Sequence, residues 1–205
     1  MTDDKHIQTL LVATGNPGKF REIAAELEPL SIRCLSLQDL PPTAECHEEG
    51  STFEENARQK AIYYAQATGQ TTLADDSGIE VDALGGAPGV RSARYAGQPC
   101  DDCANNRKLV QELAGVALER RTARFRCVMA LADTDGNILA TTQGVIEGLI
   151  IDKPRGQGGF GYDPHFLVPR LGKTTAELSR DEKNEISHRG QATRAMREAI
   201  RKLPK

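Results

Sequence analysis

The sequence predicts an α/β protein in which a mixed β-sheet is flanked by helices. Short apolar runs typical of buried strands alternate along the chain with segments of helical periodicity, and two alternating segments flank a turn at Asp135–Gly136. Apolar side chains make up 39% of the 205 residues, enough for a core that buries roughly 70% of the surface of the unfolded chain. We therefore expect one domain, or two closely packed lobes.

The first elements form half of a βαβ unit. Residues 10–14 are a continuous apolar run that predicts a buried strand, and a glycine-containing turn follows at 15–19. Apolar side chains at helical spacing within 20–27 predict a helix that ends before Pro29. Residues 32–36 are the next expected strand.

The middle of the chain predicts a loop, a helix and a strand. Residues 38–51 are polar, contain two prolines and indicate a loop. The segment Thr52–Glu55 has the pattern of a capping box, and a helical period continues from it to Gly69. A short strand at 71–74 is expected to end at the segment Asp75-Asp-Ser-Gly78.

The second half contains the remaining expected elements. A hairpin is expected with arms at 124–131 and 138–151, and it can extend into a second lobe. The other expectations are a shaped loop at 85–100, a helix at 101–115, a glycine-rich loop at 156–161, a strand at 166–168 and a closing amphipathic helix at 192–203.

Composition excludes several classes of protein. A net charge of −3 with 27% charged residues argues against a disordered tail, a collagen-like fibre and a nucleic-acid coat. No apolar run approaches the ~18 to 20 residues of a membrane helix, and the first residues are acidic and polar where a secretion signal is basic and then apolar. We therefore expect a cytoplasmic protein.

The cysteines also favour a reducing compartment. Five of them, an odd number, are scattered along the chain, unlike the dense even spacing of a disulfide framework. Cys100 and Cys103 have the CxxC spacing of a zinc knuckle, but no second pair accompanies them. A solvated loop is favoured there over a metal or redox role.

Charge is distributed unevenly. Residues 1–86 carry a formal charge of −9 and residues 87–205 a formal charge of +6. An acidic part can supply carboxylates for a metal ion, and a basic part can receive an anion, so together they suit a metal-bound polyphosphate. Two solvated faces of opposite sign explain the charge equally well.

The first candidate site is the turn between the first strand and the first helix. Such a turn offers backbone N–H groups, the positive end of the helix dipole and the Lys19 ammonium to a phosphate. It lacks the spacing of a Walker A loop, and a plain turn is about as good an explanation.

The second candidate is the adjacent pair Asp75 and Asp76 at the expected strand end. Two carboxylates near a polyphosphate suit a Mg²⁺ site, with one as ligand and one as ligand or as general base for water. Neighbouring side chains of a strand point to opposite faces, so both serve one site only if the strand bends, which Gly78 would allow. A solvated turn is the alternative, and Glu48 or Glu49 can add a metal ligand or be surface charge.

Two later segments could bind a flat ring and phosphates. Gly158-Gly-Phe-Gly-Tyr-Asp163 combines backbone freedom with two aromatic rings and a carboxylate, which suits a stacked base, although a packed aromatic turn has the same composition. Lys183 and Ser187-His-Arg-Gly190 place three possible cations just before the last helix, where they could hold phosphates or a base. A surface position is the alternative for these cations.

Taken together and in this order, these segments resemble the inosine triphosphate pyrophosphatases, also called dITP/XTP pyrophosphatases. The similarity extends over nearly the whole chain. The matching segments are Ala13-Thr-Gly-Asn-Pro-Gly-Lys19, Thr52-Phe-Glu-Glu-Asn-Ala57, Ala74-Asp-Asp-Ser-Gly78, Leu84-Gly-Gly-Ala-Pro-Gly89, Ser92-Ala-Arg-Tyr95, Gly158-Gly-Phe-Gly-Tyr-Asp-Pro164 and Ser187-His-Arg-Gly190.

The resemblance implies a Mg²⁺-dependent homodimer that hydrolyses ITP, dITP and XTP to the monophosphate and pyrophosphate, keeping deaminated purines out of DNA and RNA. It implies one domain over residues 1–205, with an elongated mixed β-sheet, two lobes and a central substrate cleft. It implies a small-molecule nucleotide substrate, with neither direct nucleic-acid binding nor a membrane.

The resemblance also implies roles for individual residues. Asp76 would bind the metal and accept a proton from the attacking water, with Glu48 as a second metal ligand. The substrate would be bound by Thr14, Gly15, Asn16, Pro17, Gly18, Lys19, Ser77, Phe160, Gly161, Tyr162, Asp163, Lys183, His188 and Arg189. His188 and Arg189 are the available donors to O6 of a 6-oxo purine, and an adenine amino group would leave such donors unpaired.

The acidic loop departs from the family pattern. Where the family often has Glu-Glu-x-Gly, this chain has His47-Glu-Glu-Gly50. Counting back from Gly50 places Glu48 at the metal-ligand position, but the choice between Glu48 and Glu49 stays open.

Two other functions compete with this one. The first is a pyrophosphatase for modified pyrimidine nucleotides, which would be more active on altered pyrimidine triphosphates than on ITP. The second is a nucleotide-sensing binding protein that would bind tightly and release no pyrophosphate. The presence of Lys19, Asp76 and Lys183 argues against the binding protein.

Overall fold

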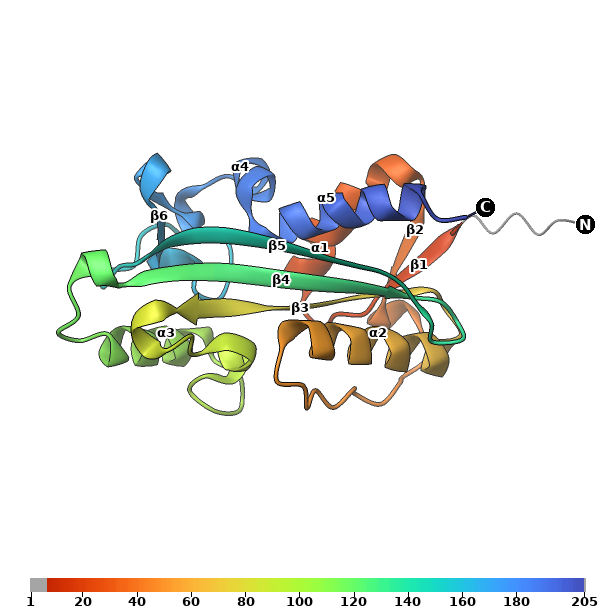
Figure 1. The fold of residues 1–205 in the computed structure, drawn as a ribbon, viewed down its shortest axis with the longest axis horizontal. Coiled ribbons are helices and arrows are strands. Elements are labelled where there is room, and N and C mark those ends of the chain that lie inside the picture. Colours follow the sequence, from red (N-terminus) through yellow and green to blue (C-terminus); the bar gives the residue numbers. More distant parts are fainter. Residues whose placement is uncertain (1–6, 205) are drawn as a thin grey trace, which may run out of the picture. The chain divides into compact units, whose positions relative to one another are not determined.

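The computed structural model describes residues 7–204 (Figure 1). They divide into two compact units. Within the described residues, unit 1 comprises 7–76, 127–144 and 189–204, and unit 2 comprises 77–126 and 145–188. The chain passes from one unit to the other inside three strands, β3 (Thr72–Val81), β4 (Thr122–Ala132) and β5 (Ile138–Ile150), and once more between residues 188 and 189.

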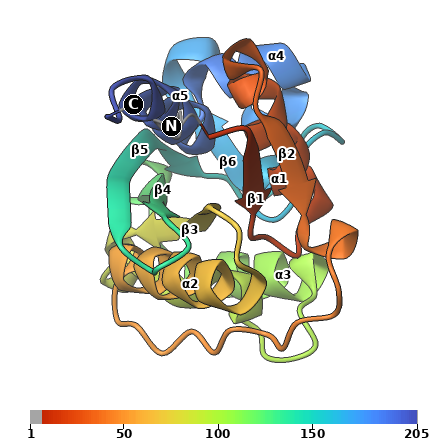
Figure 2. The same ribbon diagram turned by 90° about the vertical axis from the view of Figure 1, so that its right-hand side faces the viewer.

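A mixed seven-stranded sheet has the order β2-β1-β3-β4-β5-β6-β7. β1 (Thr9–Val12) pairs in parallel with both β2 (Arg33–Ser36) and β3, and Figure 2 shows β1 and β2 side by side. At the other end, β6 (Phe166–Val168) is antiparallel to β5 and to β7 (Lys173–Thr174). The predicted α/β class with a mixed sheet is confirmed.

Side-chain caps define where the helices begin. Asn16 caps α1 (Pro17–Leu27), Thr52 forms a capping box on α2 (Phe53–Thr68), and Asp101 caps α3 (Asp102–Glu112). Gly69 ends α2 in the left-handed conformation that favours glycine. In unit 1, α2 lies on one face of the sheet and α5 (His188–Arg201) on the opposite face (Figure 1).

Most of the predicted elements are confirmed, and three details are wrong. The strand predicted at 71–74 continues through Asp75 and Asp76 to Val81 instead of ending before them. A helix, α4 (Arg180–Ile186), was missed although Ser179 and Glu182 form its capping box. Lys183 therefore lies within α4, and the last helix begins already at His188.

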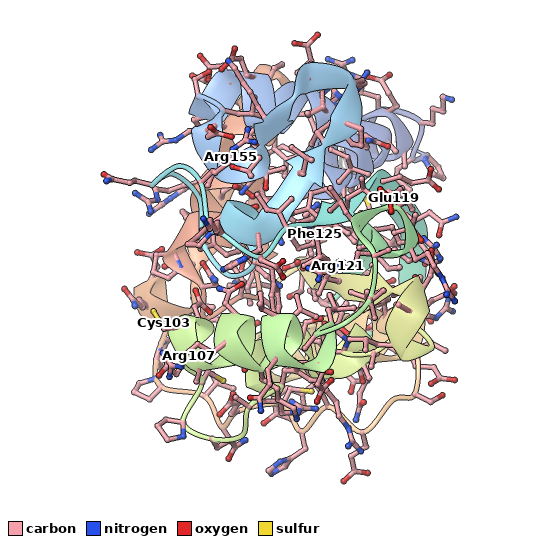
Figure 3. The ribbon with its side chains drawn as sticks, turned by 90° about the vertical axis from the view of Figure 1, so that its left-hand side faces the viewer. Cys103, Arg107, Glu119, Arg121, Phe125 and Arg155 are labelled. Atoms are coloured by element: carbon pink, nitrogen blue, oxygen red, sulfur yellow. The ribbon has the colours of Figure 1, made fainter. Side chains whose placement is uncertain are left out.

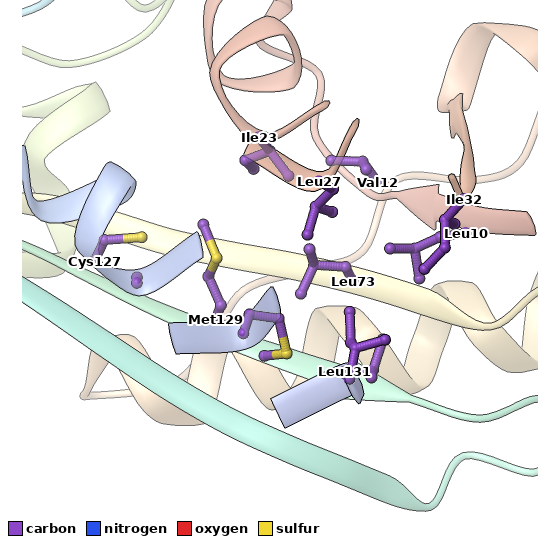
Figure 4. Packing of buried hydrophobic residues seen from close by; sticks show 12 residues of the cluster. Leu10, Val12, Ile23, Leu27, Ile32, Leu73, Cys127, Met129 and Leu131 are labelled. Atoms are coloured by element: carbon purple, nitrogen blue, oxygen red, sulfur yellow. The ribbon is translucent and has the colours of Figure 1, made fainter. Parts of the chain in front are cut away.

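Each unit has its own hydrophobic core. In unit 1, Leu73 of β3 and Met129 of β4 pack among side chains of β1, α1 and α5 (Figure 4). In unit 2, Phe125 of β4 packs against Phe166 of β6, with ring centroids 4.5 Å apart. Among residues 7–204, no helix is long and apolar enough to cross a bilayer.

The core of unit 1 gives a stability prediction. Leu73 is fully buried, so we expect Leu73→Ala to lower the free energy of unfolding by about 2 to 5 kcal/mol through lost contacts and the cavity left behind. Leu139 is 37% exposed, and Leu139→Ala should change it by less than about 0.5 kcal/mol. Urea denaturation measures both, and equal effects would contradict this assignment of the core.

Candidate functional site

In unit 1, the glycine-containing turn is organised around Asn16. The Asn16 side-chain oxygen accepts hydrogen bonds from the backbone N–H groups of Gly18 (2.8 Å) and Lys19 (3.2 Å). The Asn16 N–H donates to the Thr14 hydroxyl oxygen over 3.2 Å. Several N–H groups expected to face a phosphate are thus already used within the turn. Its remaining means of attracting an anion are the helix dipole and the Lys19 ammonium.

The Lys19 ammonium belongs to a network of buried charges. Its Nζ lies 2.9 Å from Asp75 Oδ2, and the Arg189 Nε lies 3.6 Å from the same oxygen. Arg189 also donates to Glu22 of α1 over 2.6 Å. The side chains of Asp75 and Arg189 are 1% and 2% exposed. Four charged groups from β3, α1 and α5 are therefore fixed together inside unit 1.

Asp76 points to the other face of β3, because consecutive side chains of a strand alternate. Asn56 of α2 donates from Nδ2 to Asp76 Oδ2 over 3.0 Å and accepts at Oδ1 from the Gly50 N–H over 2.8 Å. A Cβ atom on Gly50 would lie 2.5 Å from Asn56 Oδ1, so this approach requires glycine. Asn56 thus joins the acidic loop to Asp76.

A second side chain of α2 connects Glu48 to the same strand. Lys60 pairs with Glu48 over 2.7 Å and donates to the backbone oxygen of Asp75 over 3.0 Å. Glu48 is half-buried, whereas Glu49 is exposed. The structure therefore favours Glu48 over Glu49 as the acidic group beside Asp76.

The two adjacent aspartates differ in their ionisation. Burial alone would raise the pKa of Asp75, but the positive charges of Lys19, Arg189 and Lys60 outweigh it and hold that pKa well below its usual range. Burial raises the pKa of Asp76, and Lys60 and Asn56 offset this only in part. Asp75 is thus a permanently charged structural partner, whereas Asp76 can more readily accept a proton.

The donor set around Asp76 suits a magnesium ion. Within residues 7–204, no three His, Cys, Asp or Glu side chains converge as a complete metal site. Mg²⁺, however, is usually held by one or two carboxylates together with substrate phosphates and water. Asp76 and Glu48 fit that requirement, because the Glu48 charge is near enough to raise the pKa of Asp76 and both carboxylates raise the pKa of Lys60.

In unit 2, the glycine-rich loop closes around the Asp163 carboxylate. Asp163 Oδ2 accepts from the Phe160 N–H over 2.8 Å and from Lys183 Nζ over 2.6 Å, and its Oδ1 accepts from the Thr175 hydroxyl over 2.8 Å. The Lys183 ammonium also lies 4.8 Å from the centre of the Phe160 ring. These contacts fix the ring of Phe160, which stays partly exposed.

The remaining expected residues of unit 2 lie on separate elements. Tyr162 is buried, and its hydroxyl donates to the backbone oxygen of Ser92 over 2.8 Å. The His188 ring stacks on Phe125, with centroids 4.9 Å apart and planes 12° apart. Ser77 lies half-buried in β3.

The structure therefore sorts the expected site residues into two groups. In unit 1 it brings Lys19 together with Asp75 and Arg189, and it brings Asp76 together with Glu48 through α2. In unit 2 it brings Phe160 and Asp163 together with Lys183. The three cations expected just before the last helix lie elsewhere, because Lys183 is within α4 and His188 and Arg189 are the first two residues of α5. Lys183 pairs with Asp163, His188 stacks on Phe125 and Arg189 pairs with Glu22. Their binding of phosphates or of a base stays a prediction.

Asn56 and Lys60 were missed as site residues by the sequence analysis. They lie one turn apart on α2, so both face the sheet. Asn56 is fully buried, and the other buried residues of α2 are alanines and aromatic residues. A polar residue on an otherwise largely apolar helix face was the signal in the sequence that could have identified Asn56 as a site residue. The CxxC pair, by contrast, is exposed: Cys100 precedes α3, and Cys103 lies in the first turn of that helix rather than in a loop.

Comparison with known proteins shows which family this chain belongs to. A model of the Ham1 family matches residues 10–199. A dITP/XTP pyrophosphatase of Geobacter sulfurreducens is 53% identical over 191 residues, which cover 93% of this chain and 96% of that protein. A protein of the same name from Desulforamulus reducens is 50% identical over 194 residues, covering 95% and 96%.

Solved structures agree with this match. A HAM1 protein from Coxiella burnetii superposes with a TM-score of 0.85 at 40% identity, covering 95% of this chain and 99% of that chain. A nucleoside-triphosphatase, also titled dITP/XTP pyrophosphatase, from Mycobacterium abscessus superposes with a TM-score of 0.75 at 42% identity, covering 92% and 98%.

The contrast between the two aspartates predicts opposite effects on stability. Asp75→Asn removes the buried counter-charge that Lys19 and Arg189 share and should lower the free energy of unfolding by about 3 kcal/mol. Asp76→Asn removes a carboxylate that burial disfavours and should leave stability unchanged or raise it. Thermal unfolding of both variants in EDTA measures the two changes in stability. A similar loss of stability in both variants would contradict the different roles assigned to Asp75 and Asp76.

Proposed function

Because this chain belongs to the Ham1 family, we propose that it is a nucleoside triphosphate pyrophosphatase that acts on deaminated purine nucleotides. Its substrates would be ITP, dITP and XTP, and its products the nucleoside monophosphate and pyrophosphate. The observation that carries the proposal is the buried Asp76 carboxylate with a raised pKa, held by Asn56 beside Glu48. Hydrolysis would remove these nucleotides from the pool used for DNA and RNA.

Asp76 would accept the proton of the water that attacks the α-phosphorus. A general base works best when its pKa is raised toward the working pH, and burial moves the pKa of Asp76 in that direction. Asn56 would keep the carboxylate oriented, because its amide fixes one of the two oxygens. The other oxygen would then face the water.

The phosphates would be held chiefly by Lys19 and the turn around it. The Lys19 side chain is 18% exposed, so it can reach an anion while Asp75 fixes its direction. Thr14, Gly15, Asn16, Pro17 and Gly18 would shape the turn. Arg189 is enclosed by Glu22 and Asp75, so we assign it to supporting this site, and its contact with substrate stays a prediction.

A Mg²⁺ ion would be held by Asp76 and Glu48 together with phosphate oxygens, and it would neutralise the charge of the departing pyrophosphate. The Lys60 ammonium keeps Glu48 beside the end of α2 that carries Asn56. Mg²⁺ dependence is thus part of the proposal.

The base would be recognised by the residues grouped in unit 2. The partly exposed Phe160 ring would be the surface for stacking, with its N–H held by Asp163 and its ring beside the Lys183 ammonium. Gly161 and Tyr162 of the same loop would contact the substrate with it. His188 and Ser77 would contact the substrate. A homodimeric assembly and a cytoplasmic location remain predictions, and the five free cysteines are consistent with the latter.

A pyrophosphate-release assay tests the function. We expect the purified protein with Mg²⁺ to release pyrophosphate from ITP, dITP and XTP in preference to ATP, GTP and the pyrimidine triphosphates. Asp76→Asn should lower kcat by about 100-fold or more, because it removes the proton acceptor. Orthophosphate release would instead indicate attack at the terminal phosphate, and near wild-type turnover in Asp76→Asn would remove that residue from the mechanism.

The two acidic-loop residues form a matched pair for testing the metal. Glu48→Gln should raise the Mg²⁺ concentration needed for half-maximal activity by about tenfold or more, because it removes a charged ligand. Glu49→Gln, on an exposed neighbour, should leave that concentration unchanged. A Mg²⁺ titration of both variants gives the answer, and the opposite result would assign the ligand to Glu49.

A further inference from the structure

Gly161, between the two aromatic rings of the glycine-rich loop, is held from outside the loop by α3. The Gly161 N–H donates to Asp102 Oδ2 over 2.8 Å, and the Gly161 carbonyl accepts from Asn106 Nδ2 over 2.9 Å. The N–H and the C=O of Gly161 are therefore both hydrogen-bonded to side chains of the same helix.

Asp102 and Asn106 are arranged for this contact by α3 itself. They lie one turn apart, so their side chains share a face of the helix. Asn106 Nδ2 also donates to the backbone oxygen of Asp102 over 2.9 Å, which fixes the amide. Asp102 is in the first turn of α3, where a negative charge is favoured by the helix dipole. Figure 3 shows α3 with the neighbouring Cys103 and Arg107 labelled.

The loop needs such a constraint because its backbone is unusually free. Gly159 has φ of 74° and Gly161 has φ of 60°, both in the region that favours glycine. The Asp163 carboxylate fixes the Phe160 N–H on the inner side of the loop. Asp163 and Lys183 hold the N–H and the ring of Phe160 from one side, but the backbone that follows is held by α3. Without α3 the glycine-rich backbone around Gly161 would have more conformational freedom, and the position of the adjacent Phe160 would be less well defined.

We propose that Asp102 and Asn106 are positioning residues that hold Gly161, and through it the Phe160 ring, in the orientation that recognises the purine base. This inference rests on the proposed function. Neither residue contacts the reacting phosphate in the proposal. Their loss should therefore act on binding of the base, and on the preference between bases, more than on the chemical step.

The test compares kcat and KM for ITP and ATP in variants of α3. Asp102→Ala should lower the ratio of kcat/KM for ITP to that for ATP by about fivefold, mainly through a higher KM for ITP, as expected for one exposed hydrogen bond. Asp102→Asn keeps an oxygen that can accept from the Gly161 N–H and should restore the ratio to within about twofold.

Asp101→Ala and Arg107→Ala are the controls. The Asp101 side chain caps α3 by accepting from the Cys103 and Ala104 N–H groups, so its removal weakens the helix without touching Gly161. Arg107 is an exposed neighbour on the same helix. Both variants should keep the wild-type ratio. An equal loss of selectivity in Asp101→Ala would overturn the proposal, because a general weakening of α3 would then explain the effect.

An unchanged ratio in a folded Asp102→Ala variant would overturn the proposal as well. If that variant does not fold, Asn106→Ala takes its place and should lower the same ratio. This variant removes the hydrogen bond to the Gly161 carbonyl and the one within α3. Failure of the proposed function would show in the wild type itself, as no pyrophosphate from ITP. Failure of the positioning role leaves the wild type active and selective.

Discussion

The buried ion pairs around Asp75 are the interaction on which the rest of unit 1 depends. Asp75 is 1% exposed and meets Lys19 from α1 and Arg189 from α5, while Arg189 also pairs with Glu22. Charges removed from water are tolerated only when partners surround them, so these groups can be buried only together. Their mutual dependence fixes the direction of Lys19 and the positions of the two helix ends relative to β3. The neighbouring Asp76, for which Lys60 and Asn56 offset the effect of burial only in part, lies in a strand that this network already holds.

In unit 2, a buried carboxylate likewise holds its surroundings in place, here by ordering a glycine-rich loop. Asp163 is 2% exposed and gathers the Phe160 N–H, the Thr175 hydroxyl and the Lys183 ammonium around its two oxygens. A loop rich in glycine pays a high entropic cost of ordering, so it needs several bonds to adopt one conformation. The contacts of α3 with Gly161 complete this set from the outer side. In both units, a buried acidic side chain therefore organises the groups around it, while Lys19 in unit 1 and Phe160 in unit 2 stay partly accessible.

Local chemistry in the sequence predicted much of this arrangement. The capping box at Thr52 predicted the start of α2, because a cap depends only on the adjacent backbone. The caps at Asn16 and Asp101 were not recognised, and α1 begins at Pro17, ahead of the predicted segment 20–27. The continuation of β3 through Asp75 and Asp76 was not predictable in this way. Two adjacent aspartates followed by Ser77 and Gly78 are typical of a turn, and they remain in a strand here because Lys19, Arg189 and Asn56 satisfy them from three helices.

The sequence by itself determined the α/β class, the order of the main elements and the family, since these follow from local periodicity, capping and motifs that span the chain. The tertiary structure decided which partners each charged side chain has and how far it is buried. Neighbours in sequence such as Asp75 and Asp76, or His188 and Arg189, point into different surroundings and acquire different partners. The physical reason is that the state of a charge depends on burial and on groups within a few ångströms, and those groups come from distant parts of the chain.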